Sequence, residues 1–368
     1  MKFAVIKNDR DQLRDKAAEA IIQRLLCHGH KIVSSDNDIR FVVNLTDIES
    51  PQFFRRSSRS IFVLSIVSSE KPLGNLRSIC YTTLVRSLSN IVLCIVPSHN
   101  SSPEMETNNY EIYFTTPEAG FYHIPFDPEK IYNYIIPLAG SHFAIGNQFF
   151  TDLPPRFWKG SPVVEKIKEY GQELDRMGVL PTPFPLRELL SEENIQHLYT
   201  LFEIKGLSYG NLSAREHIPE LGETTFWMSA RGINKAQISK VGKDVLLVKG
   251  FDYEQGEALV SVPPEFDEKA RVSVDTVEHE LIYSTFPDVD AIVHVHAWMD
   301  GVLCTQQNYP CGTYELAQEV VNLLRQTDNP CHSAVGLKNH GLTITGPGLE
   351  AIFQCIRGKL NIKVPMFK

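Results

Sequence analysis

Two histidines separated by one residue, His294 and His296, form a candidate metal-binding pair. They lie in the run 291–296 (AIVHVH), whose β-branched, apolar composition predicts a strand. Because side chains alternate faces along a strand, both imidazoles project from one face while Val293 and Val295 project from the other. Two imidazoles one pleat apart can bind a single metal ion, although surface strands also produce such pairs by chance.

Two further segments add to this chemistry. Asp275 precedes an amphipathic helical pattern, where its carboxylate could cap the helix or act on a metal or a proton. His340 lies in the run 335–344, which reads as a strand interrupted at Asn339-His340-Gly341. A histidine beside glycine in a strand break can approach a metal closely. His279, four residues after Asp275, could approach the same site, but a packed helix histidine is the simpler interpretation.

Residues 1–150 predict a small α/β layer domain with a partly parallel sheet. Short apolar runs at 3–6, 31–33, 41–45, 61–67 and 91–96 predict strands, and helical spacing predicts helices near 13–25 and 76–88. The first strand leads into Lys7-Asn8-Asp9-Arg10, with no glycine that would let the backbone approach a pyrophosphate. A packing or regulatory domain is therefore favoured over a nucleotide site.

The segment 151–185 predicts a helix followed by a proline-rich linker. Ser161 and Pro162 supply an N-cap and a first helical residue, and Met177 closes an apolar helix face. The run 181–185 (PTPFP) is typical of a stiff, extended connector. Residues 186–368 then form the second domain, which carries all the candidate site residues.

Length and composition exclude several classes of protein. The 368 residues predict two domains, and 36 Lys+Arg against 44 Asp+Glu disfavour nucleic acid as a partner. No apolar run approaches the roughly 20 residues of a membrane-spanning helix. The seven cysteines include no CxxC pair, which fits reduced thiols in a cytoplasmic protein better than a disulfide framework.

Six short segments follow one another along the second half of the chain: 210–215 (GNLSAR), 228–232 (MSARG), 273–276 (SVDT), 294–296 (HVH), 312–317 (GTYELA) and 339–341 (NHG). Together they resemble the class II aldolase/adducin family, which includes fuculose-phosphate aldolase and ribulose-phosphate 4-epimerase. The resemblance covers about residues 186–358. It implies an α/β/α domain with a mainly antiparallel central sheet, so the whole chain is expected to be an α/β protein.

The resemblance also implies the roles of individual residues. His294, His296 and His340 would be the metal ligands, and three protein ligands are typical of catalytic zinc. Zinc is the implied metal, with iron, cobalt, nickel or manganese as alternatives. Asp275 takes the position of the family's acid, which ligates the metal or acts as a base beside it. The implied substrate- and anion-binding residues are Gly210, Asn211, Arg231, Gly232 and Ser273.

The sequence departs from the family pattern at two places. Arg231 replaces a small hydroxyl residue and Val274 replaces a serine, so the substrate's anionic group can be a carboxylate as well as a phosphate. Only fifteen residues, 297–311, separate His296 from Gly312. The longer family insert, which supplies a tyrosine acting across the subunit interface, is therefore missing, and neither Tyr309 nor Tyr314 aligns with it.

Two functions of different classes follow. The first is a metal-dependent lyase or isomerase that performs aldol cleavage, epimerisation, dehydration or decarboxylation through a metal-stabilised enediolate. Its substrate would be a small hydroxy-carbonyl compound or sugar acid, with or without phosphate, and the resemblance implies a homo-oligomer. The alternative is a non-catalytic, adducin-like module for assembly or ligand sensing. Retention of the three histidines and the acid favours the enzyme.

Overall fold

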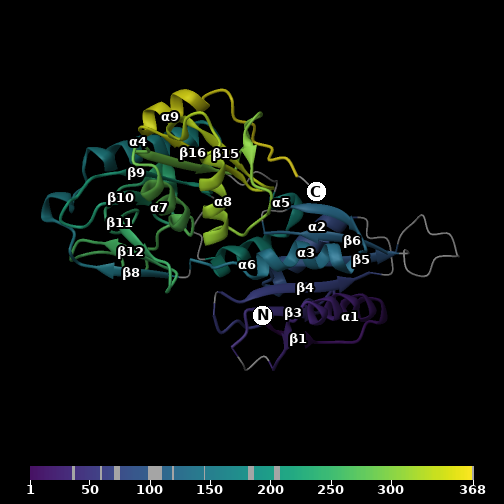
Figure 1. Ribbon diagram of the computed structural model, residues 1–368. Helices are drawn as coiled ribbons and strands as arrows, with labels where there is room; N and C mark the ends of the chain where they lie inside the picture. The colour runs from purple at the N-terminus through teal and green to yellow at the C-terminus, as the bar shows by residue number, and fades with distance from the viewer. Residues whose placement is uncertain are drawn as a thin grey trace. The chain divides into compact units, whose positions relative to one another are not determined.

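The computed structural model describes residues 1–34, 38–58, 60–69, 75–97, 110–117, 120–144, 146–180, 186–202 and 208–366. The chain forms two compact units (Figure 1). The first comprises 1–141, 185–198 and 366–368, and the second comprises 142–184 and 199–365. Among the described residues, no helix is both long and apolar enough to cross a membrane.

The first unit contains a seven-stranded sheet in the order β2-β1-β3-β4-β5-β6-β7. Strands β1 to β5 run parallel, and β6 and β7 add an antiparallel hairpin at one edge. The predicted partly parallel α/β domain is confirmed. Its elements are β1 (Lys2–Lys7), α1 (Gln12–Cys27), β2 (Lys31–Ile32), β3 (Phe41–Leu45), β4 (Phe62–Ser68), α2 (Leu76–Ser87), β5 (Ile91–Pro97), β6 (Tyr110–Thr115), β7 (Phe121–Pro125), α3 (Pro128–Ala139) and α5 (Leu186–Leu189), followed by the start of α6 (Glu192–Phe202).

The second unit contains a nine-stranded sheet in the order β14-β15-β16-β13-β9-β10-β11-β12-β8. Every neighbouring pair is antiparallel except β14–β15 and β8–β12, so the mainly antiparallel sheet was predicted but its two parallel edge pairs were not. Its strands are β8 (Gly146–Phe150), β9 (Asn211–Arg215), β10 (Phe226–Ser229), β11 (Val245–Asp252), β12 (Glu257–Ser261), β13 (Ala291–Val295), β14 (Leu303–Cys304), β15 (Ala334–Leu337) and β16 (Gly341–Gly346). Its helices are α4 (Pro162–Arg176), α7 (Thr276–Thr285), α8 (Tyr314–Leu324) and α9 (Leu349–Ile356), with short 3-10 turns at Pro155–Phe157, Lys235–Gln237 and Pro330–His332.

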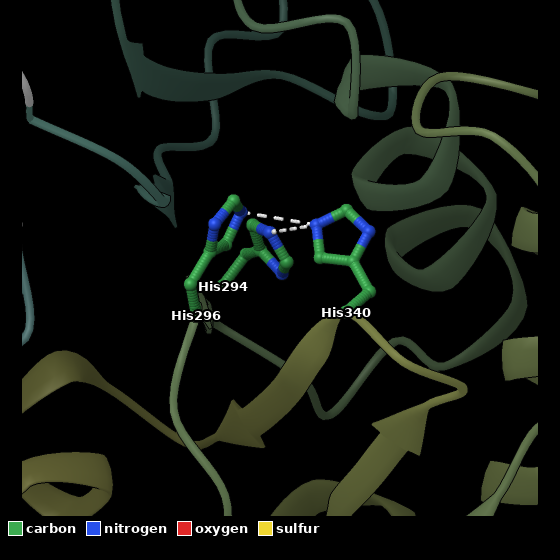
Figure 2. A group of neighbouring side chains, drawn as sticks. All are labelled: His294, His296 and His340. Carbon is green, nitrogen blue, oxygen red and sulfur yellow. Dashed lines mark hydrogen bonds between the residues drawn. The ribbon is translucent and has the colours of Figure 1, made fainter. Parts of the chain in front are cut away.

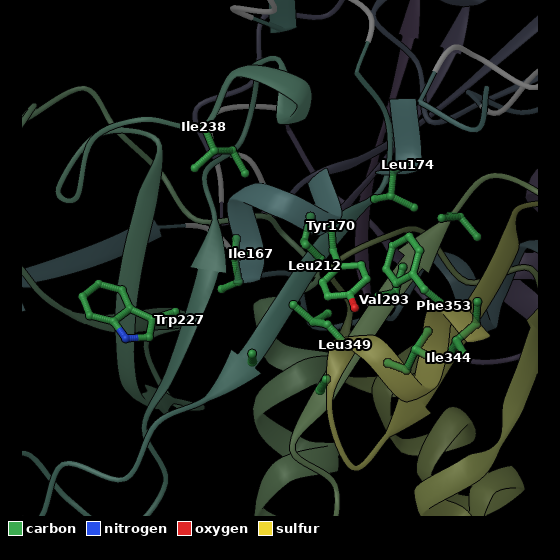
Figure 3. Close-up of a cluster of buried hydrophobic side chains, with 14 of the residues drawn as sticks. Ile167, Tyr170, Leu174, Leu212, Trp227, Ile238, Val293, Ile344, Leu349 and Phe353 are labelled. Carbon is green, nitrogen blue, oxygen red and sulfur yellow. The ribbon is translucent and has the colours of Figure 1, made fainter. Parts of the chain in front are cut away.

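Helices cover both faces of this sheet and make three layers. On one face, side chains of α4 and α9 such as Tyr170 and Phe353 pack with Val293 of β13 (Figure 3). On the other face, α7 and α8 pack with alternate strand residues that include Ile292. Burying one large aliphatic or aromatic side chain contributes about 1.5–3 kcal/mol. The two clusters therefore hold β13 rigidly between helical layers, with alternate residues facing α7 and α8.

The unit boundaries differ from the predicted boundaries at 150 and 185. Strand β8 pairs with β12, so Gly146–Phe150 belongs to the second sheet and not to the first domain. Conversely, residues 185–198 belong with the first unit. The predicted cap of α4 is confirmed, because Ser161 Oγ accepts a hydrogen bond from the Val164 amide and Pro162 opens the helix. The proline-rich run 181–185 lies outside the described residues.

Candidate metal centre

Three histidine side chains from two separate segments meet in the second unit. His294 lies in β13, His296 directly follows that strand, and His340 lies in the turn before β16 (Figure 2). His340 Nε2 lies 3.2 Å from His294 Nε2 and 3.0 Å from His296 Nε2. The three residues form a group whose donor nitrogens all lie within 4.8 Å of one another.

Two glycines allow the backbone to bring these rings together. A Cβ atom on Gly341 would lie 2.2 Å from the Val295 carbonyl oxygen, so only glycine lets β16 approach the end of β13 this closely. On the other side, a Cβ on Gly210 would lie 2.4 Å from the His294 carbonyl oxygen, and Gly210 adopts φ +72°. The backbone of His294 and His296 is therefore confined between two glycine contacts.

The segment around His340 is a hairpin and not an interrupted strand. Strands β15 and β16 pair antiparallel, with Leu337 opposite Gly341, and the three residues between them form the turn. Asn339 adopts the left-handed conformation at φ +59°, which Asn tolerates better than most residues. The His340 amide donates to the Leu337 carbonyl at 3.0 Å. The turn thus positions the third imidazole at the end of the hairpin that faces β13.

The spacing of the three nitrogens suits a divalent cation. In a tetrahedral site with zinc–nitrogen bonds of 2.0–2.1 Å, two ligand nitrogens are about 3.3 Å apart. His294 Nδ1 lies 3.1 Å from the Leu342 carbonyl oxygen, which places a proton on Nδ1 and leaves the Nε2 lone pair free. His340 Nε2 faces two other ring nitrogens, and one proton can satisfy only one of them. A cation would satisfy all three.

Burial keeps these imidazoles neutral, as metal ligation requires. It lowers the pKa of His294, an effect that Asp275 partly offsets. Burial together with the neighbouring His340 and His294 lowers the pKa of His296 well below its ordinary value. Burial and His294 lower the pKa of His340 to about 3. All three rings therefore keep an unprotonated nitrogen at neutral pH.

Asp275 lies at the N-cap position of α7 but does not cap the helix with its side chain. Its Oδ2 instead accepts hydrogen bonds from Asn211 Nδ2 at 2.7 Å and from Ser273 Oγ at 3.1 Å. Burial alone would raise the pKa of Asp275, but its electrostatic interactions with His294, His340 and His279, with the Ser273 hydrogen bond, lower it below its ordinary value. Asp275 is thus a buried carboxylate that interacts electrostatically with two of the clustered histidines.

The predicted anion-binding residues take different positions. Asn211 lies directly opposite His294 across the β9–β13 pair, so both side chains share a face. The Asn211 amide nitrogen and the Ser273 hydroxyl bond to Asp275, while Asn211 Oδ1 is buried without a hydrogen-bond partner. Arg231 is exposed, and its backbone amide donates to the Arg271 carbonyl at 2.7 Å. Gly232 follows it at φ +72°.

Two residues near the centre were not singled out from the sequence. Lys235 is only 3% exposed and donates from Nζ to the Ser208 carbonyl at 2.6 Å. Burial lowers the pKa of Lys235 to about 8, against the opposing effect of Asp275. Cys311 Sγ lies 3.2 Å from His340 Nδ1. Neither stands out in the sequence, because Lys235 lies in a polar stretch and Cys311 precedes a glycine turn.

A second buried polar group lies on the same face of the sheet, against α7. His279 is fully buried, with Nδ1 2.7 Å from Ser213 Oγ, and the same hydroxyl lies 2.7 Å from the Tyr283 hydroxyl. Thr343, the cross-strand neighbour of His294, donates to Glu278 at 2.6 Å. His279 therefore behaves as the packed helix histidine expected from the sequence.

Comparisons with known proteins find similarity in this part of the chain. Residues 194–308 match the family model described as the Class II Aldolase and Adducin N-terminal domain. The match includes Asp275, His294 and His296 and ends before His340. No family covers the N-terminal region. No curated protein matches the chain in sequence.

Several solved structures are similar at low identity. The candidate aldolase/epimerase/decarboxylase YgbL from Klebsiella pneumoniae is 18% identical, with a TM-score of 0.31, over 52% of this chain and 82% of its own. YgbL from Escherichia coli is 16% identical, with a TM-score of 0.33, over 52% of this chain and 82% of its own. An aldolase II superfamily protein from Pseudomonas syringae is 19% identical, with a TM-score of 0.32, over 54% of this chain and 73% of its own. The match of residues 194–308 to the family model, together with the order of the motifs, identifies this part of the chain as a class II aldolase and adducin domain.

Proposed function

We propose that the protein is a metal-dependent lyase or isomerase that acts on a small hydroxy-carbonyl compound or sugar acid, with or without phosphate. The observation that carries the proposal is the convergence of three Nε2 atoms. His340 Nε2 lies 3.2 Å from His294 Nε2 and 3.0 Å from His296 Nε2. In this proposal His294, His296 and His340 hold the metal. A divalent cation held by three imidazoles would supply Lewis-acid polarisation of a substrate oxygen.

Zinc is the proposed metal. Neutral imidazoles suit zinc, and its tetrahedral preference agrees with the spacing of the three nitrogens. Iron, cobalt, nickel and manganese remain alternatives, since imidazole also binds other first-row metals. The choice among them is made by measuring which metal copurifies with the protein.

Asp275 is the proposed proton-transfer residue. Its lowered pKa keeps it a carboxylate at neutral pH, so it can accept a proton from a substrate carbon or hydroxyl. Asn211 and Ser273 fix its Oδ2 by hydrogen bonds, which orients the carboxylate without competing for a metal. The aspartate side chain is shorter than that of glutamate and has fewer rotatable bonds. Together with these two hydrogen bonds, it restricts the positions that the carboxylate can reach.

The substrate is proposed to lie between the metal centre and the predicted anion-binding residues Gly210, Asn211, Arg231, Gly232 and Ser273. The exposed Arg231 guanidinium would pair with a carboxylate or a phosphate. The unpartnered Asn211 Oδ1 would accept a hydrogen bond from a substrate hydroxyl, because a buried acceptor without a donor is costly. Lys235 would add positive charge beside Asp275. We further propose a cytoplasmic homo-oligomer, which size-exclusion chromatography with light scattering would test.

Proton exchange at carbon tests the proposal without knowledge of the final product. The zinc-loaded protein is incubated in D₂O with a panel of hydroxy-aldehydes, keto acids and their phosphates, and exchange beside the carbonyl is followed by NMR. We expect exchange in at least one compound and its loss in Asp275→Asn, with zinc retained in that variant. Absence of metal and of exchange across the panel would instead support the non-catalytic, adducin-like module.

A further inference from the structure

The loop that carries Cys311 is fixed beside the metal centre. Gly312 adopts φ +72°, and a Cβ there would lie 2.6 Å from the Val274 side chain, next to Asp275. The Gly312 carbonyl accepts a hydrogen bond from the Ala144 amide at 2.7 Å. Thr313 Oγ1 donates to the Pro310 carbonyl at 2.9 Å and also caps α8. The thiol is therefore presented by a backbone that has little freedom to withdraw.

The Cys311 sulfur contacts the ring of His340 in an unusual way. Sγ lies 3.2 Å from Nδ1 and 3.4 Å from Nε2 of the same imidazole. A sulfur aligned with the Nδ1–H bond would be much farther from Nε2, which lies across the ring. The nearly equal distances place the sulfur beside the ring and close to the nitrogen that faces His294 and His296.

The distance to Nε2 alone is close to that between two ligands of one ion, whereas the 3.2 Å to Nδ1 is shorter than such a site allows. With zinc–nitrogen bonds of 2.0–2.1 Å and a zinc–sulfur bond of 2.3 Å, a tetrahedral site separates nitrogen from sulfur by about 3.5 Å. Cys311 Sγ is 3.4 Å from His340 Nε2. The sulfur is not a member of the group whose atoms all lie within 4.8 Å of one another, so it must still turn toward His294 and His296. Rotation about the Cα–Cβ bond is the movement that this ligation requires.

We propose that Cys311 is a fourth, displaceable metal ligand, so that the resting site is His₃Cys. This proposal rests on the metal centre of the proposed function. On ligation the thiol would lose its proton to solvent and its sulfur would donate a lone pair to the cation. A substrate oxygen would replace the sulfur, and the released thiolate would take a proton from solvent. A soft sulfur ligand selects zinc, cobalt or cadmium over magnesium and manganese, which prefer oxygen.

Cobalt substitution tests this ligand directly. Metal-free protein is titrated with Co²⁺, which reports nitrogen ligation by visible d–d bands and thiolate ligation by a near-ultraviolet charge-transfer band. Wild type is expected to show both, and Cys311→Ser only the d–d bands. Cys331→Ser is the matched control, since Cys331 is also partly buried in this unit but donates to the Asp288 carbonyl at 2.7 Å. That variant should keep the charge-transfer band.

The outcomes separate this inference from the proposed function. Cobalt d–d bands without a charge-transfer band in wild type would overturn ligation by Cys311 and leave the three-histidine centre intact. A charge-transfer band that survives in Cys311→Ser would also overturn it. Failure of wild type to bind Co²⁺ at all would overturn both. Zinc competition adds a second readout, because loss of a ligand should weaken binding by more than the 10–100-fold typical of a second-shell change.

Discussion

At the scale of single residues, the centre depends on hydrogen bonds that fix each side chain in one role. The Leu342 carbonyl determines the tautomer of His294, and Asn211 and Ser273 orient Asp275. The histidine positions could be predicted because strand alternation is a local property of sequence. The partners of Asp275 could not be assigned, since Asn211 and Ser273 are brought to it only by tertiary structure.

Replacing Ser273 by alanine should shift the pH dependence of proton exchange. The Ser273 hydroxyl stabilises the Asp275 carboxylate, and its loss raises the pKa of Asp275. A base with a raised pKa becomes active at higher pH, so the acid limb of the rate profile should move upward by about one unit at most. The exchange assay measured between pH 4 and 8 checks this shift. An unchanged acid limb, with exchange still dependent on Asp275, would contradict the assigned hydrogen bond.

At the scale of elements, the end of β13 and the turn between β15 and β16 position the three histidines. Gly341 lets β16 approach β13, and the turn at Asn339 aims His340. The sequence identified the glycine and the histidine but predicted an interrupted strand, because the pairing of β15 with β16 depends on a three-residue turn with a left-handed Asn. Local signals predicted the strand at 41–45 correctly, whereas β6, β7 and α3 were not predicted.

Gly341→Ala should weaken metal binding as well as stability. The added Cβ would collide with the Val295 carbonyl oxygen, at 2.2 Å, and force β16 and His340 away from β13. Overpacking of this kind typically costs about 1–3 kcal/mol. Zinc affinity and urea unfolding measure the two effects. Gly358→Ala is the control, because its Cβ would meet nothing within 4 Å and only its positive φ is strained. Equal zinc affinity in both variants would contradict this account of Gly341.

Glu278 on α7 should make the metal-free protein less stable as the pH rises. Burial and the nearby Asp275 raise the pKa of Glu278 to about 8, from an ordinary value of 4.5. A carboxyl with a raised folded-state pKa stabilises the fold below its unfolded pKa, and this contribution is lost between about pH 4.5 and 8. Glu278→Gln removes that loss, at up to about 1.4 kcal/mol per pH unit. Urea unfolding at pH 5 and 9 measures the free energy of unfolding of wild type and Glu278→Gln. If this free energy changed equally with pH in both proteins, the raised pKa of Glu278 would be contradicted.

At the scale of the whole molecule, the chain consists of two units with separate sheets. The histidines, Asp275 and Cys311 all lie in the second unit. The number of units was predicted from length, but their boundaries were not, because β8 joins the second sheet by pairing with β12, more than a hundred residues later. Pairing at such sequence separation leaves no local signal. The first unit's role was likewise not predictable from a family resemblance that begins at residue 186.

Metal binding should stabilise one unit and not the other. Because each unit has its own sheet and buried core, we expect two calorimetric transitions. Zinc at about one hundred times its dissociation constant should stabilise the second unit by about 2.7 kcal/mol. Differential scanning calorimetry with zinc and with chelator measures this difference. A single transition, or equal shifts of both, would contradict the independence of the units.

Three imidazoles from two distant segments are expected to bind one divalent ion. Elemental analysis after equilibrium dialysis against zinc tests it most directly, using wild type, the double variant His294→Ala/His296→Ala, and His340→Ala. We predict about one zinc per chain in wild type, the number that a single three-histidine site would hold. Both variants should lose that zinc, with their fold verified by circular dichroism. Full zinc occupancy in either folded variant, or none in wild type, would contradict the claim.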